Sequence, residues 1–238
     1  MSVVKVPVEF DLGVGLPILR GERSMGPDRS EGRLICLHDL GSDLDEFGPL
    51  PTVLAAAGFV VDVVDLPGHG LSDGDDGDLT LVGPAVEALV ARCRDESGSL
   101  GLIAVGATAT VATTIGEQHG VLAQVVVNPV LDGRLAAEPR ARSTRLVVQG
   151  EDANLVGTRT QRYFSHVLGD KLMVFNPLLA SGVAEVGRIG AVTEHVVLFL
   201  RRYLQPGPRP AASFRSNSSP PPPPSPTARS AEATEHQT

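Results

Sequence analysis

Several residue types are scarce in this sequence, and each scarcity narrows the class of protein that it encodes. The 238 residues include no tryptophan, two cysteines, two lysines and no run of 18 apolar residues. Two cysteines cannot build a disulfide framework, and the lack of a long apolar run argues against a membrane-spanning helix. The residues after Met1 also lack the apolar core of a secretory signal. We therefore expect a soluble, cytoplasmic protein.

Positive charge is the minority charge. Twenty Lys and Arg residues stand against 28 Asp and Glu residues, which gives a formal net charge of −8. Such a surface repels the phosphates of nucleic acids and of anionic membranes. We therefore expect a small molecule or a protein as the partner, and neither nucleic acid nor membrane. We also expect no cofactor and no metal. The Asp-rich segment 73–78 departs from the residue order of a calcium-binding EF-hand loop and is interpreted as a solvated acidic turn.

Proline is concentrated at one end of the chain. Nine of the 19 prolines lie between Pro206 and Pro226, and residues 205–238 contain a single aromatic residue, Phe214. A segment of this composition buries too little apolar surface to offset the entropy lost on ordering. The sequence therefore predicts a folded domain over 1–204 and a disordered Pro/Ser-rich tail over 205–238.

Short apolar segments alternate with helical patterns through the predicted domain. This alternation is typical of an α/β fold with a mostly parallel sheet flanked by helices on both faces. The first strand and the stretch 13–20 look like a hairpin that leads into the sheet. The predicted strands cover 3–10, 34–37, 60–65, 100–105, 121–127, 146–149 and 172–175, and the predicted helices cover 45–57, 80–96, 108–119, 154–168 and 191–204.

Three predicted loops carry motifs at the carboxyl ends of strands, where sheets of this kind bind ligands. They are Leu37-His38-Asp39-Leu40-Gly41-Ser42, Asp65-Leu66-Pro67-Gly68-His69-Gly70-Leu71-Ser72-Asp73 and Gly106-Ala107-Thr108-Ala109-Thr110. In this order and spacing they resemble the oxyanion loop, the D-x-P-G-x-G-x-S turn and the nucleophile elbow of the α/β-hydrolase superfamily. The resemblance covers about residues 8–204. The segment 128–145 is too short for a helical lid, so the resemblance implies a lidless member.

The resemblance implies a degenerate nucleophile position at Thr108. Active members have the pattern G-x-S-x-G, whereas Thr108 replaces the serine here and Thr110 replaces the second glycine. Thr108 can act as a nucleophile if a base activates it. Alternatively, it caps or packs the helix that follows the strand.

The acid and the base of the expected triad are also incomplete. The family's histidine lies in the loop after the last strand, and residues 176–190 contain none. The acid position falls near Asp152, or at Asp132 in the alternative location that some members use. Either aspartate can equally be a solvated loop carboxylate.

The backbone parts of the site do not depend on side-chain identity. The resemblance places the oxyanion-binding N–H groups at Leu40 and Ala109. It places His38, Asp39, His69 and Ala107 along the pocket. Asp39 stands where the family has glycine, and its carboxylate either opposes an oxyanion from inside the site or faces solvent.

These positions favour an α/β-hydrolase-fold protein that binds a small molecule or a partner without catalysis. One alternative is a weak or unconventional ester or acyl hydrolase that uses Thr108. The other is an interaction protein that works through its Pro-rich tail, because polyproline segments dock in aromatic grooves.

Overall fold

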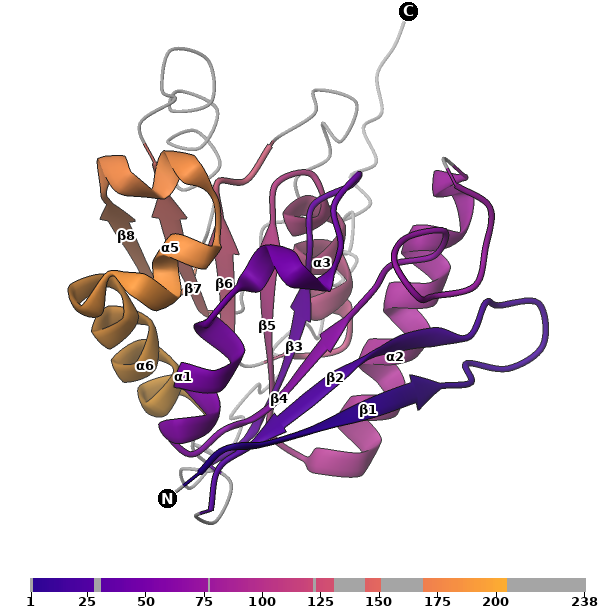
Figure 1. Ribbon diagram of the computed structural model, residues 1–238, viewed down its shortest axis with the longest axis horizontal. Helices are drawn as coiled ribbons and strands as arrows, with labels where there is room; N and C mark the ends of the chain where they lie inside the picture. Colours follow the sequence, from indigo (N-terminus) through magenta and orange to yellow (C-terminus); the bar gives the residue numbers. More distant parts are fainter. Residues whose placement is uncertain are drawn as a thin grey trace, which may run out of the picture. The chain divides into compact units, whose positions relative to one another are not determined.

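One sheet of eight strands, in the order β1-β2-β4-β3-β5-β6-β7-β8, forms the centre of the computed structural model (Figure 1). The predicted helix 154–168, the tail 205–238 and both acid candidates, Asp132 and Asp152, lie outside the residues that the structure describes. The described residues are 2–27, 31–76, 78–121, 123–130, 144–150 and 169–204.

The sheet begins with an antiparallel hairpin and continues with parallel strands. β1 (Val4–Phe10) pairs antiparallel with β2 (Leu19–Met25), and β2 pairs antiparallel with β4. All other neighbouring strands pair parallel. The second strand of the hairpin is therefore 19–25 and not the predicted stretch 13–20. The remaining strands are β3 (Arg33–Leu37), β4 (Val60–Val64), β5 (Leu100–Val105), β6 (Ala123–Val127), β7 (Thr144–Gln149) and β8 (Lys171–Phe175).

Helices cover both faces of the sheet, as predicted. Figure 1 shows α1 (Leu50–Ala56), α5 (Ala184–Arg188) and α6 (Gly190–Leu204) on the near face and α2 (Val82–Ser97) and α3 (Thr108–Gln118) on the far face. The described helices include none that is long and apolar enough to cross a membrane.

The predicted helix 45–57 is divided into two elements. Its first part is a 3-10 helix (Leu44–Phe47), which begins where the Asp43 side chain accepts the Asp45 N–H. Gly48, with φ of +50°, ends this turn, and α1 begins after Pro49. The helical pattern in the sequence is continuous because both parts bury apolar residues on the same side.

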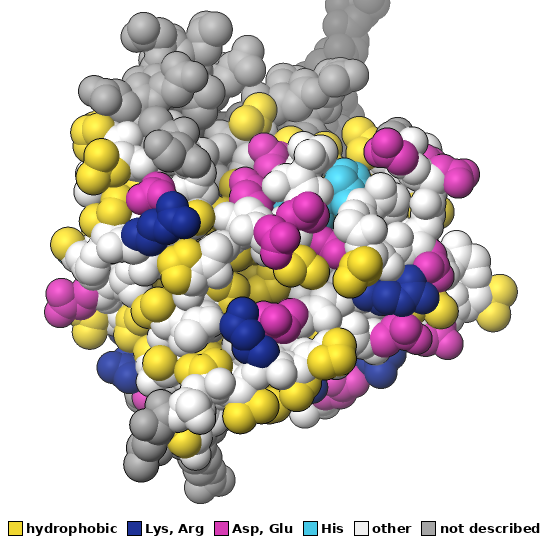
Figure 2. Space-filling model, viewed as in Figure 1, with side chains coloured by type: hydrophobic (Ala, Val, Ile, Leu, Met, Phe, Trp, Pro, Cys, Tyr) yellow, Lys and Arg dark blue, Asp and Glu magenta, His cyan; other side chains and the backbone are white. Residues whose placement is uncertain are grey.

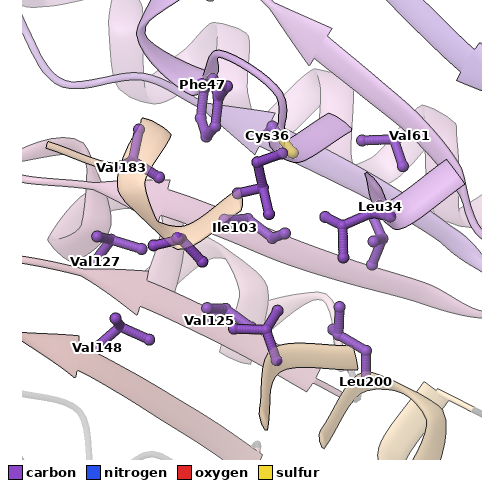
Figure 3. Close-up of a cluster of buried hydrophobic side chains, with 14 of the residues drawn as sticks. Leu34, Cys36, Phe47, Val61, Ile103, Val125, Val127, Val148, Val183 and Leu200 are labelled. Carbon is purple, nitrogen blue, oxygen red and sulfur yellow. The ribbon is translucent and has the colours of Figure 1, made fainter. Parts of the chain in front are cut away.

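The core consists of two apolar layers, one on each face of the sheet. Along β3, Leu34 and Cys36 join one layer, and Ile35 and Leu37 join the other. Figure 3 shows the first layer, in which Leu200 of α6 packs near the strands. Burial of each such leucine contributes about 1.5–3 kcal/mol, which explains why the central strands are apolar at consecutive positions.

The strand order places the three motif loops side by side. β3 lies between β4 and β5, with Leu37 level with Val64 on one side and with Ala104 on the other. The loops that follow these three strands therefore meet at one edge of the sheet. No helical lid covers this edge in the part of the chain that the structure describes.

Candidate functional site

His38 joins the loop after β3 to the loop after β4. Its ring is fully buried; Nδ1 donates to the backbone oxygen of Asp39 at 2.7 Å, and Nε2 accepts the Leu66 N–H at 3.0 Å. Since Nε2 accepts an N–H, the single proton of the ring is on Nδ1. Burial lowers the pKa of His38 and so keeps the ring neutral. Both nitrogens are engaged, which leaves neither to act as a base.

His69 also connects these two loops, but it belongs to the loop after β4 and bonds to the loop after β3. Its Nε2 accepts the Gly41 N–H at 3.0 Å, and its Nδ1 donates to the backbone oxygen of Pro67 at 2.8 Å. The rings of His38 and His69 lie 5.3 Å apart, centre to centre. The two motif histidines therefore hold the loops in shape.

Asp65 fixes the D-x-P-G-x-G-x-S turn from inside. Its side chain is buried, with Oδ1 accepting the Leu44 N–H at 2.8 Å and Oδ2 accepting the Leu71 N–H at 2.9 Å. A Cβ at Gly70 would lie 2.1 Å from Oδ2, and Gly70 has a φ of +50°. Ser72 completes the turn by donating to the Asp65 backbone oxygen at 2.6 Å. This motif determines loop geometry.

The tight turn after β5 has its apex at Gly106. β5 ends at Val105, Gly106 has a φ of +55°, and α3 begins at Thr108. In hydrolases with this elbow, the nucleophile occupies the strained position between strand and helix. Here that position is glycine, so it carries no side chain.

Thr108 lies two residues beyond the apex, inside the first turn of α3. Its side chain is fully buried, and its Oγ1 has no hydrogen-bond partner among the described residues. It does not cap the helix, because Ala107 occupies the cap position and no side chain caps there. Of the predicted roles, the structure fits packing. Ala109 is likewise buried within α3.

The Asp39 carboxylate points into the site, and the residue is half-buried there. Its Oδ1 accepts two backbone N–H groups, from Leu40 and from Ala107, at 2.8 Å each. Ala107 follows the apex, and the residue after the apex supplies one of the two oxyanion-binding N–H groups in this fold. The pair that converges is therefore Leu40 with Ala107, and the predicted donor Ala109 does not take part. Both N–H groups are occupied by the chain's own side chain.

Glu46 is a site residue that sequence reasoning missed. Its Oε2 accepts the Asp39 N–H at 2.9 Å, and burial, with the nearby Asp39 carboxylate, raises its pKa. No sequence pattern indicates this contact, because it depends on the 3-10 turn that follows Asp43. Figure 2 shows acidic side chains gathered around a histidine at the upper part of the molecule.

Asn128, also missed, ties the other strand ends together. It has a φ of +45°, which asparagine tolerates better than most residues. Its Nδ2 donates to the Leu179 backbone oxygen at 2.9 Å, and its Oδ1 accepts the Gly150 N–H at 2.7 Å. The ends of β6 and β7 and the turn after β8 are thereby connected.

The other described histidines lie away from these loops or face solvent. His195 is exposed on α6, where its Nδ1 donates to the Ala191 backbone oxygen at 2.6 Å. His119 follows α3 and lies 3.4 Å from Glu87. Among the described residues, no group of three His, Cys, Asp or Glu side chains is arranged to hold a metal ion.

Comparison with solved structures identifies the fold. A dienelactone hydrolase from Anabaena variabilis has a TM-score of 0.69 and 17% identity, covering 86% of this chain and 100% of that chain. An esterase from Pyrococcus furiosus has a TM-score of 0.68 and 15% identity, covering 84% of this chain and 91% of that chain. No family model and no curated protein sequence matches the chain. At such identities, the likeness confirms the predicted fold and says nothing of activity.

Proposed function

We propose that this chain, which has the α/β-hydrolase fold, binds a small molecule or a protein partner without hydrolysing it. The observation that carries the proposal is that Oδ1 of Asp39 accepts the N–H groups of both Leu40 and Ala107. An ester hydrolase needs such a pair free for the oxyanion that develops on its substrate. A carboxylate in that place both blocks the donors and repels the developing charge.

The apex of the turn after β5 supports the same proposal. Gly106 offers no hydroxyl, thiol or carboxylate at the position where relatives of this fold carry the nucleophile. Loss of even one oxyanion donor costs a hydrolase about 10²–10³-fold in rate. A site that lacks the nucleophile and has both donors filled is not equipped for ester hydrolysis, which favours a binding role for this chain.

Hydrolysis through Thr108 has less support. Its Oγ1 is buried and unpartnered among the described residues. The hydroxyl of threonine attacks only when a base removes its proton. The ring nitrogens of His38 and His69 are already engaged in the contacts that shape the loops.

The net charge supports the choice of partner. At −8, the chain favours a small molecule or a protein over nucleic acid or an anionic membrane. We place this binding role in the cytoplasm, where the two buried thiols, Cys36 and Cys93, stay reduced.

Labelling with a fluorophosphonate probe, which reacts with activated hydroxyl nucleophiles, tests the proposal. We expect no labelling of the wild-type protein and p-nitrophenyl acetate turnover at the rate of buffer alone. Thr108→Val is the matched variant, because it keeps the shape of the side chain and removes a buried hydroxyl that has no partner. Labelling or turnover that this substitution abolishes would overturn the proposal in favour of a hydrolase.

A further inference from the structure

The Asp39 carboxylate is held by N–H groups from two separate loops. Leu40 follows Asp39 directly, whereas Ala107 is 68 residues further along the chain. The first hydrogen bond is local, because it joins a side chain to the N–H of the next residue. The second hydrogen bond joins two loops across the edge of the sheet. Two N–H groups that converge on one anionic oxygen constitute an anion site with its ligand in place.

The loop that carries Leu40 is anchored by contacts that do not involve this carboxylate. The Asp39 N–H donates to Glu46 at 2.9 Å, and the Gly41 N–H donates to His69 at 3.0 Å. The Ser42 N–H donates to the backbone oxygen of Asp39 at 3.2 Å. These contacts hold the Leu40 N–H in its direction when the side chain at position 39 is shortened.

The turn that carries Ala107 is anchored as well. The Gly106 N–H donates to the Val127 backbone oxygen at 3.0 Å, and the Gly106 oxygen accepts the Val130 N–H at 2.9 Å. A Cβ at Gly106 would lie 2.0 Å from Oδ2 of Asp39. The carboxylate therefore fills the space that glycine leaves open, and its removal would leave a carboxylate-sized space between two fixed donors.

We infer that the Leu40 and Ala107 N–H groups form a binding site for a small carboxylate, and that Asp39 is a built-in ligand that keeps this site closed. The inference rests on the proposed function, because it takes these two N–H groups to bind a ligand and not to serve ester hydrolysis. A tethered carboxylate is present at a much higher effective concentration than a free one at millimolar levels. External carboxylates therefore enter only when the Asp39 side chain leaves.

Matched pairs of substitution and ligand test the inference. Asp39→Gly removes the CH₂ and the carboxylate of the side chain, which acetate matches in size and charge. Asp39→Ala removes the carboxylate alone, which formate matches. We expect acetate to shift the amide proton resonances of Leu40 and Ala107 in Asp39→Gly with a dissociation constant of about 1–100 mM. Formate should do the same in Asp39→Ala, which keeps the test valid if the glycine variant does not fold.

Four controls define the result, three of them proteins and one a salt. Wild type and Asp39→Asn should not respond, because the amide oxygen of asparagine still accepts both N–H groups. Asp43→Gly should not respond either, because the Asp43 carboxylate is exposed and, within the described residues, accepts the Asp45 N–H and neither of the two N–H groups of the site. Potassium chloride at equal ionic strength corrects for salt.

Two results would overturn the inference. One is the absence of a saturable shift in both Asp39→Gly and Asp39→Ala, which would mean that the two N–H groups do not bind a free carboxylate. The other is an equal shift in wild type, which would mean that Asp39 does not close the site. Neither result alters the fluorophosphonate experiment, so the two proposals fail separately.

Discussion

Two buried aspartates, three residues apart, are stabilised in different ways. Asp62, in the middle of β4, is fully buried and is bonded by Arg23 at 2.6 and 3.1 Å and by Arg33 at 2.6 Å. Asp65, directly after β4, is also buried, yet its carboxylate accepts two backbone N–H groups. An aspartate inside the sheet is thus paired with cations, whereas an aspartate at the edge of the sheet is paired with main-chain N–H groups.

The difference separates a structural role from a role in shaping a site. Guanidinium groups cancel the charge of Asp62, whereas N–H groups leave Asp65 and Asp39 with their negative charge and fix the loops around them. In the described part of the chain, the basic group nearest to Asp65 is His38 at 3.8 Å, and that ring is neutral. The carboxyl edge of the sheet therefore keeps a negative field that the interior does not have.

Asp62→Ala is expected to have the largest effect on stability. It removes the buried partner of Arg33, whose side chain is only 7% exposed, and leaves that guanidinium with the half-exposed Glu96 as its remaining ion partner. Removing one partner of a buried pair costs about 3–5 kcal/mol of unfolding free energy, which urea denaturation measures. As a control, Asp73→Ala breaks the half-exposed pair with Arg20 and should cost less than about 1 kcal/mol. Equal losses in the two variants would refute the role assigned to burial.

Asp65→Asn is expected to have a smaller effect. The asparagine keeps one oxygen and turns an NH₂ group toward one of the two N–H donors, so one hydrogen bond to a charged acceptor is lost. Such a bond contributes about 1.5–3 kcal/mol, again measured by urea denaturation. A loss as large as that of Asp62→Ala would remove the distinction between cation pairing and backbone pairing.

Acid is expected to have the smallest effect on stability, and this effect acts through His38. Burial lowers the pKa of His38 in the folded state below its ordinary value of 6.5. Above pH 6.5 the ring is neutral in both the folded and the unfolded chain. Below pH 6.5 the ring binds a proton in the unfolded chain but stays neutral in the folded chain. The unfolding free energy should then fall by up to about 1.4 kcal/mol per pH unit.

Urea denaturation between pH 7.5 and pH 5.5 tests this slope. His38→Gln, which removes the titrating ring, should show a correspondingly weaker dependence on pH. If the two proteins lose stability in parallel as the pH falls, the slope comes from other groups and the neutral ring of His38 has no part in it.

The central strands could be predicted because burial on both faces leaves consecutive apolar residues. The predicted ranges 34–37 and 100–105 agree with β3 and β5 to within one residue. β2 could not be found in this way, because its sequence, LRGERSM, is mostly polar. It pairs with β4 partly through Arg23, whose charge is satisfied by Asp62, a contact between residues distant in sequence.

The motif loops were found from the sequence, but their geometry was not. The spacing of G-x-S-x-G points to Thr108, while the positive φ that marks the elbow falls at Gly106. The sequence pattern does not say where β5 ends. A shift of two residues exchanges the apex of the turn, Gly106, for a buried position inside α3. The direction of Asp39 was equally hidden, because it depends on the missing Cβ of Gly106.

The fit between Asp39 and Gly106 constrains how this sequence can change. A serine at 106 alone would place its Cβ 2.0 Å from the Asp39 carboxylate, and a glycine at 39 alone would supply no nucleophile. Each single replacement is therefore either obstructed or without benefit, and only the paired replacement places a serine at the apex. A hydrolase would also need a base, because the ring nitrogens of His38 and His69 are engaged. Positions 39 and 106 are therefore epistatic: the effect of a substitution at one depends on the residue at the other, and a serine at the apex requires both substitutions.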